Sequence, residues 1–177
     1  YPMIAILKPF NTCAQICVYC QRNWEILEVG SRNAMAKRET IEKAIEWIRE
    51  QKDIGEILVT GGDPLIMDDK NLNWILSEIA SIDHIYRIRI GTRTPVVLPM
   101  RWTDELVDII AKFNKLGKRE ISIATHFEHS YEITPETLQV TRKIRNAGLV
   151  IYNQQVFTSE NSRKFESVKL RRDLKSI

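Results

Sequence analysis

Hydrophobic residues follow two alternating patterns along the chain. Short, nearly continuous apolar runs are typical of strands that are buried on both faces. Between these runs, Ile, Leu and Ala recur every three or four residues, which is the spacing of an amphipathic helix. The apolar runs predict strands over residues 4–7, 56–60, 85–90, 120–125 and 149–152. The helical spacing predicts helices over residues 38–51, 69–81, 103–117, 134–148 and 165–177.

The order of these elements predicts an α/β fold. Strand and helix alternate five times, and this alternation is typical of a parallel sheet with βα connections. Thr103 is a suitable N-cap for the third helix, because Asp104 and Glu105 follow it in the first turn. Polar residues follow every strand, at the sheet edge where α/β enzymes place their active sites. We expect one domain over residues 1–177.

All three cysteines lie in one short stretch that follows the first strand. Cys13, Cys17 and Cys20 have the spacing C-x3-C-x2-C. Structural zinc sites use four ligands, usually as two separated pairs. A [4Fe–4S] cluster accepts thiolates at its corners, so three cysteines leave one iron open to a small molecule. The grouping favours a cluster over three cysteines buried as small hydrophobes, and a disulfide would leave one thiol over.

A second motif ends the second strand. Gly61 and Gly62 are followed by Asp63. Paired glycines let a ligand approach the backbone closely, and the adjacent carboxylate could bind an ammonium group. The alternative is a tight turn without a ligand, for which glycine and aspartate are common residues.

Composition and charge narrow the class of protein. The chain has 26 Lys and Arg against 23 Asp and Glu, a net charge of +3, which is too small to indicate nucleic-acid or membrane-surface binding. No apolar run approaches the ~18 residues that cross a bilayer, and we expect no signal peptide. Three cysteines without a disulfide pattern are typical of a reducing compartment, so we expect a cytoplasmic protein.

The ends of the sequence indicate part of a longer chain, truncated at both ends. The sequence begins with Tyr1 rather than methionine, and it stops inside the last helical pattern. Unpaired strand edges recruit other chains. We therefore expect residues 1–177 on their own to be prone to aggregation.

The cysteine motif, with Tyr19 before its last cysteine, resembles that of the radical S-adenosylmethionine enzymes. The resemblance implies a partial parallel (β/α) barrel, with about five of six βα units present. In that superfamily the open iron of a [4Fe–4S] cluster chelates the methionine end of S-adenosylmethionine. An electron from the cluster then cleaves the sulfonium and releases a 5′-deoxyadenosyl radical.

A longer set of motifs resembles the lysine 2,3-aminomutase family. These motifs are Tyr1-Pro2, Gly61–Leu65, Arg89–Pro99, Thr125–His129, Glu132–Thr134 and Asn153-Gln154. The resemblance implies an isomerase that moves an amino group between adjacent carbons of an amino acid, using the adenosyl radical and pyridoxal phosphate. Two alternatives stay open: a radical enzyme without pyridoxal phosphate that abstracts hydrogen from another substrate, and a non-enzymatic iron–sulfur or zinc module.

The resemblance also implies roles for individual residues. The implied cluster ligands are Cys13, Cys17 and Cys20. The implied S-adenosylmethionine contacts are Tyr19, Gly61, Gly62, Asp63, Arg93, His126 and Gln154. Arg22 would bind the substrate α-carboxylate through two parallel hydrogen bonds, and no residue is assigned a catalytic role. The alternatives are a solvated loop residue at Arg22, a loop tether at Arg93 and hydrogen-bonded shell residues at His126 and His129.

The sequence differs from the aminomutase family at two places. Ile4 stands where the family has an arginine that grips pyridoxal phosphate, and Arg22 is followed by Asn23-Trp24-Glu25 in place of further arginines. The family's Schiff-base lysine would lie beyond residue 177. The expected partners are an amino-acid substrate and a reductant such as flavodoxin or ferredoxin, and the sequence is compatible with a homo-oligomer.

Overall fold

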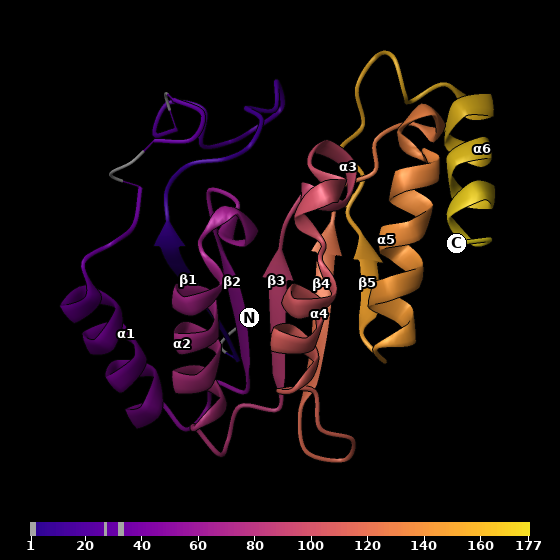
Figure 1. Cartoon of the computed structure of the whole chain (residues 1–177). Helices are drawn as coiled ribbons and strands as arrows, with labels where there is room; N and C mark the ends of the chain where they lie inside the picture. The colour runs from indigo at the N-terminus through magenta and orange to yellow at the C-terminus, as the bar shows by residue number, and fades with distance from the viewer. Residues whose placement is uncertain (1–2, 27, 32–33) are drawn as a thin grey trace.

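The computed structural model describes residues 3–26, 28–31 and 34–177, so the Tyr1-Pro2 motif lies outside the described residues. Five strands form one parallel sheet in the order β1-β2-β3-β4-β5 (Figure 1). The strands are β1 (Ile4–Phe10), β2 (Glu56–Gly61), β3 (Arg87–Gly91), β4 (Glu120–Thr125) and β5 (Val150–Asn153). The sheet confirms the predicted α/β fold and is consistent with a partial radical S-adenosylmethionine barrel that does not close.

The helices connect consecutive strands. Each crossover advances one strand in the same direction, and right-handed crossovers therefore place the helices on one face of the sheet. Figure 1 shows α1, α2, α4 and α5 on that face and α6 at the β5 end. The longer helices are α1 (Arg38–Glu50), α2 (Asp69–Ala80), α4 (Asp104–Ala111), α5 (Pro135–Asn146) and α6 (Lys164–Leu174). The short ones are η1 (Pro64–Ile66), α3 (Thr94–Val97), η2 (Pro99–Arg101) and η3 (Ser130–Glu132).

Element boundaries depart from the sequence prediction in a few places. The first strand continues through Pro9 to Phe10, which an edge strand allows because proline there need not donate a ladder hydrogen bond. The predicted helix over residues 103–117 ends at Ala111, and a turn follows in which Lys115 pairs with Arg119. The short helices after β2, β3 and β4 were not predicted, because each spans only three or four residues, too few to show helical periodicity.

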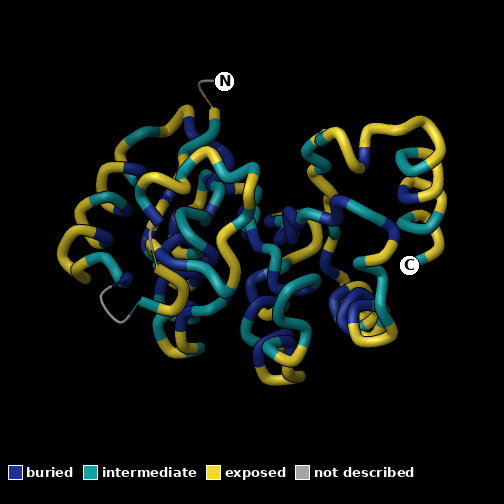
Figure 2. The backbone as a smooth tube through the Cα atoms, turned by 90° about the horizontal axis from the view of Figure 1, so that it is seen from above, coloured by how far each residue is buried: buried dark blue, intermediate teal, exposed yellow. Residues whose placement is uncertain are grey.

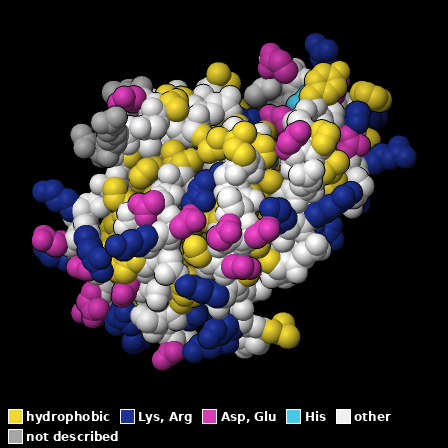
Figure 3. Space-filling view, in the orientation of Figure 1, with side chains coloured by type: hydrophobic (Ala, Val, Ile, Leu, Met, Phe, Trp, Pro, Cys, Tyr) yellow, Lys and Arg dark blue, Asp and Glu magenta, His cyan; other side chains and the backbone are white. Residues whose placement is uncertain are grey.

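The hydrophobic core lies between the sheet and its helices. Alternate strand residues are fully buried there, and they are Ile57, Val59, Ile88, Ile90, Ile121 and Ile123. The helices contribute Leu72, Ile75, Leu76, Ile79, Leu106, Ile110 and Ile144 to the same cluster. Figure 2 shows buried helix residues toward the sheet and exposed residues on the outer sides, and Figure 3 shows acidic and basic side chains mixed over that outer surface.

The other face of the sheet is polar at its base. Arg87 forms ion pairs with Glu56 at 3.4 Å and with Glu120 at 3.0 Å, and Arg89 also pairs with Glu56. The strand register explains this row, because Glu56, Arg87 and Glu120 are direct neighbours across β2, β3 and β4. Among the described residues, no helix is both long and apolar enough to cross a membrane.

Replacing isoleucine by alanine should lower the free energy of unfolding by different amounts on the two faces of the sheet. Ile88 is fully buried and Ile6 is 62% exposed on the opposite face. We expect Ile88→Ala to lower the free energy of unfolding by about 2–5 kcal/mol, because it leaves a cavity in the core. Ile6→Ala, the matched control, should change it by no more than about 0.5 kcal/mol. Urea unfolding followed by circular dichroism measures both, and equal losses would contradict this assignment of the faces.

Candidate functional site

The three cysteines lie in the cysteine loop (residues 11–26), which follows β1 at the carboxyl edge of the sheet. Backbone hydrogen bonds close its stem: Asn11 N donates to Ala34 O at 2.9 Å, and Ala36 N donates to Pro9 O at 2.9 Å. Cys20 N donates to Cys17 O at 3.0 Å and forms a tight turn between two of the cysteines. The stem therefore fixes where the cysteines stand above the sheet.

The glycine pair at the end of β2 holds this stem. Gly62 N donates to Phe10 O at 2.7 Å, and Asp63 N donates to Thr12 O at 2.8 Å. A Cβ atom on Gly62 would lie 2.1 Å from Thr12 O, and one on Gly61 would lie 2.4 Å from Phe10 O. Gly61 also has a φ of +119°, which other residues rarely adopt. Here the glycines are required by contact between two backbone segments, a reason that the sequence did not reveal.

Asp63 is buried and its carboxylate is occupied by protein donors. Its oxygens accept hydrogen bonds from Thr92 Oγ1 at 2.7 Å and Leu65 N at 3.1 Å, and from Arg93 N at 2.8 Å. Burial raises the pKa of Asp63, while these hydrogen bonds oppose the shift. The carboxylate thus fastens the loop after β3 to the end of β2, and a methionine contact at Asp63 stays a prediction.

One cavity of about 490 Å³ lies above the sheet, and it brings together every site residue predicted from the sequence. These residues are Cys13, Cys17, Tyr19, Cys20, Arg22, Gly61, Gly62, Asp63, Arg93, His126 and Gln154. They come from the cysteine loop and from the ends of β2, β3, β4 and β5. Sequence reasoning missed other lining residues, which include Gln15, Ile26, Leu58, Thr60, Thr92, Val97 and Val156.

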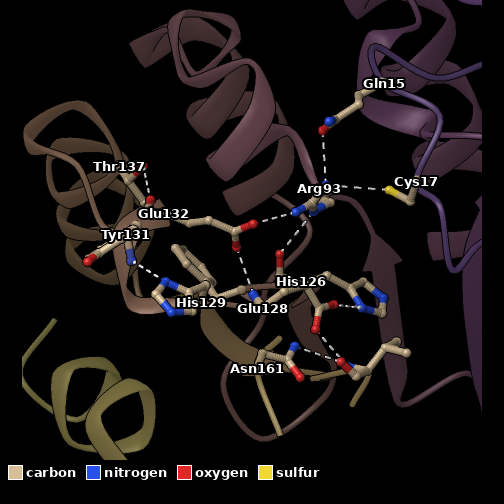
Figure 4. A network of polar contacts seen from close by, with 12 residues as sticks. Gln15, Cys17, Arg93, His126, Glu128, His129, Tyr131, Glu132, Thr137 and Asn161 are labelled. Carbon is tan, nitrogen blue, oxygen red and sulfur yellow. Dashed lines mark hydrogen bonds and ion pairs between the residues drawn. The ribbon is translucent and has the colours of Figure 1, made fainter. Parts of the chain in front are cut away.

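Arg93 connects three parts of the site (Figure 4). Its guanidinium donates to Gln15 Oε1 at 2.9 Å in the cysteine loop and to Glu132 Oε1 at 2.6 Å in η3. It also donates to the backbone oxygen of His126 at 3.3 Å and lies 5.7 Å from the centroid of the Tyr19 ring. These contacts match the alternative role given for Arg93 from the sequence, that of tethering a loop. Contact between Arg93 and an adenosyl group stays a prediction.

His126 and His129 have different surroundings. His126 Nδ1 lies 3.3 Å from Glu128 Oε1, and Glu128 is buried, with Oε2 accepting from Val156 N at 2.7 Å. His126 also lines the cavity, and none of the hydrogen bonds among the described residues uses its Nε2 atom. His129 instead pairs with Glu166 of α6 at 2.9 Å and does not line the cavity. The sequence signal that could have identified Glu128 as a site residue was its place in the Thr125–His129 motif, directly after the end of a strand.

Arg22 is already paired within the cysteine loop. Its Nε donates to Glu25 Oε2 at 3.1 Å, and its Nη2 contacts Glu25 and donates to Asn11 Oδ1 at 2.7 Å. Nη1 is buried and has no hydrogen-bond partner among the described residues. The fork expected to meet a substrate carboxylate therefore faces Glu25, and the two N–H donors of Nη1 are left over.

Three thiols around one cavity are a donor set that a [4Fe–4S] cluster accepts. The cysteines are unpaired and partly exposed, and within the described ranges no three His, Cys, Asp or Glu side chains are placed to hold one metal ion. Burial, followed by the charges of Asp63, Cys20 and Cys17, raises the pKa of Cys13 to about 12. Positive charge from iron would lower it, because metal binding favours thiolates. Iron atoms at separate corners of a cluster suit cysteines that surround a cavity.

Comparison with known proteins places the chain in a superfamily. The family model "Radical SAM superfamily" matches residues 7–161, and the chain belongs to that superfamily. This confirms the class that the cysteine motif indicated. Family membership implies a [4Fe–4S] cluster and S-adenosylmethionine.

Individual relatives carry aminomutase names. The chain is 45% identical over its whole length to an uncharacterized KamA family protein of Methanocaldococcus jannaschii, of which it covers 28%. It is 38% identical to glutamate 2,3-aminomutase of Clostridioides difficile, with all of the chain and 40% of that protein covered. It is 42% identical to L-lysine 2,3-aminomutase of Methanococcus maripaludis, with 88% of the chain and 34% of that protein covered. The chain thus spans about a third of these relatives.

Because Gly62 touches Thr12, adding a single Cβ atom at Gly62 should impair binding of the cluster. Gly62→Ala should displace the stem beside Cys13, and we expect most of the iron to be lost after anaerobic reconstitution. Gly117→Ala is the matched control, because Gly117 has a φ of +74° but nothing within 4 Å of an added Cβ. That variant should keep the parent's iron content while losing about 1 kcal/mol of stability. Iron analysis decides, and parent-like iron in Gly62→Ala would refute this role of the contact.

Proposed function

We propose that this chain is the cofactor-binding part of an amino-acid aminomutase that uses S-adenosylmethionine and a [4Fe–4S] cluster. The observation that carries the proposal is the single cavity that holds the three cysteines together with the glycine pair, Arg93, His126 and Gln154. The names of the relatives support 1,2-amino migration as the reaction. The amino acid itself and the reaction of the whole protein are part of the proposal.

Each group of residues has a proposed task in this cavity. Cys13, Cys17 and Cys20 hold the cluster, which when bound supplies an open iron for S-adenosylmethionine and the electron that cleaves it. The backbone at Gly61 and Gly62 faces the amino group of the methionine. Tyr19 and His126, whose ring centroids are 6.5 Å apart, flank the adenosine. Gln154 is placed by its backbone N–H, which donates to Thr125 O at 2.8 Å.

Arg22 is the proposed partner of the substrate carboxylate. Its pairing with Glu25 means that the substrate must either displace Glu25 or use the free Nη1 group. The first route frees the fork for the substrate, and the second places two carboxylates beside one guanidinium. Glu25 therefore competes with the substrate carboxylate for the same cation.

Pyridoxal phosphate is the least supported of the proposed cofactors. It is suggested by the lysine aminomutase relatives, while Ile4 in β1 supplies no charge where the family arginine would stand. Ile4 and the Arg22–Glu25 pair favour the second candidate, a radical enzyme that abstracts hydrogen without pyridoxal phosphate. In both cases a one-electron reductant of the flavodoxin or ferredoxin class is the proposed partner.

The proposed chemistry predicts specific products. After anaerobic reconstitution and reduction, the full-length protein should convert S-adenosylmethionine to methionine and 5′-deoxyadenosine, and it should shift the amino group of an amino acid by one carbon. Cys17→Ala should abolish both the cluster absorption and the cleavage. Chromatography of the products, with lysine and glutamate as first substrates, is the measurement. Stoichiometric zinc without iron would refute the proposal, and cleavage without amino migration would support the second candidate.

If Arg22 binds the substrate carboxylate, substitutions of Arg22 and of Glu25 should have opposite effects on substrate binding. Arg22→Lys keeps the charge but loses the fork, and it should weaken substrate binding by about 2–5 kcal/mol. Glu25→Gln removes the competing carboxylate and should lower the KM for the amino acid. Glu42→Gln is the matched control, because Glu42 pairs with Arg38 on the outside of α1.

Steady-state kinetics of the full-length protein at saturating S-adenosylmethionine measure these effects. An unchanged KM in Arg22→Lys would assign Arg22 to the structure of the cysteine loop. The substrate carboxylate would then need another partner.

A further inference from the structure

Arg93 touches the sulfur of one proposed cluster ligand. Its Nη1 lies 3.5 Å from Cys17 Sγ. Among the described residues, Cys20 Sγ also accepts a hydrogen bond, from the backbone N–H of Arg22 at 3.3 Å. Arg93 differs from this backbone donor, because it brings a full positive charge to the sulfur.

The same guanidinium is shared with a carboxylate on its far side. Arg93 Nη2 donates to Glu132 Oε1 at 2.6 Å, while Glu132 Oε2 accepts from Glu128 N at 2.7 Å (Figure 4). The Arg93 and Glu132 side chains are only 15% and 22% exposed, so water screens the pair weakly. The negative charge of Glu132 is therefore held on one side of Arg93 and Cys17 on the other.

Arginine keeps its proton in proteins, so Arg93 brings a permanent positive charge to this contact. Glu132 is held in place at both of its oxygens, by Arg93 and by the backbone N–H of Glu128.

We propose that Arg93 and Glu132 form a charge pair that sets the reduction potential of the cluster bound through Cys17. Reduction adds one electron, supplied by the external reductant, and breaks no bond in the protein. A cation and a hydrogen bond at a ligand sulfur favour the more negative, reduced state, so Arg93 raises the potential. Glu132 opposes that effect and lowers the potential. The inference rests on the proposed function for the presence of the cluster.

A tether without an electrostatic role would give a different pattern. Loss of either Arg93 or Glu132 would loosen the same contact, and both losses would change the cluster in the same direction. Charge control instead gives shifts of opposite sign. The sign of the two shifts therefore separates positioning through charge from simple attachment of the loop.

The test is a potentiometric titration of the reconstituted full-length protein, monitored by electron paramagnetic resonance. Arg93→Met should move the midpoint to a more negative potential, and Glu132→Gln should move it to a more positive one. Arg101→Met is the matched control, because Arg101 also fastens a loop, through Leu65 O at 2.7 Å and Met67 O at 3.0 Å, but does not line the cavity. Its midpoint should equal that of the parent.

Three outcomes would overturn the inference: a parent-like midpoint in Arg93→Met with full iron content, shifts of the same sign in both variants, or an equal shift in Arg101→Met. If Arg93→Met holds no cluster, Glu132→Gln decides alone, since it retains Arg93. A positive shift supports the charge pair, and a negative or absent shift overturns it. A parent protein that takes up no cluster would instead refute the proposed function.

Discussion

The site depends on one close approach of two backbone segments. Gly62 at the end of β2 lies against Thr12 in the stem of the cysteine loop, with no room for a Cβ atom between them. Two backbone hydrogen bonds cross this contact. Because Cys13 follows Thr12 directly, the contact fixes the first cysteine relative to the sheet. Cys13, Gly61 and Gly62 all line the cavity above the sheet.

Much of the fold could be predicted from the sequence, because its energetics follow local patterns. Apolar runs gave all five strands, and the residues on their helix-facing side, such as Ile57, Ile88 and Ile121, form the core. The alternation of strands with helices predicted that the strands form a parallel sheet. The end of α4 at Ala111 was not predictable from periodicity, because the following residues stay compatible with a helix until the turn at Lys115 to Arg119 redirects the chain.

The sequence predicted which residues surround the cavity, but it predicted fewer of the contacts that they make. The sequence identified the residues that surround the cavity, because strand ends and the cysteine spacing carry that information. It could not show that Asp63 and Arg22 already have protein partners, since Thr92 is 29 residues from Asp63 and the Arg22–Glu25 pair depends on the loop's path. Glu128 and Glu132 lie in motifs that the sequence analysis named, but they received no role there, because their contacts with His126 and Arg93 depend on three-dimensional placement.

The proposed function requires that three cysteines hold a cluster with one iron open to S-adenosylmethionine. Mössbauer spectroscopy of the reconstituted full-length protein tests it directly, because each iron site gives its own signal. We predict that adding S-adenosylmethionine changes the signal of one iron and leaves the others as they were. Spectra that do not change, or a cluster whose irons are all equivalent with the cofactor present at saturation, would contradict the claim.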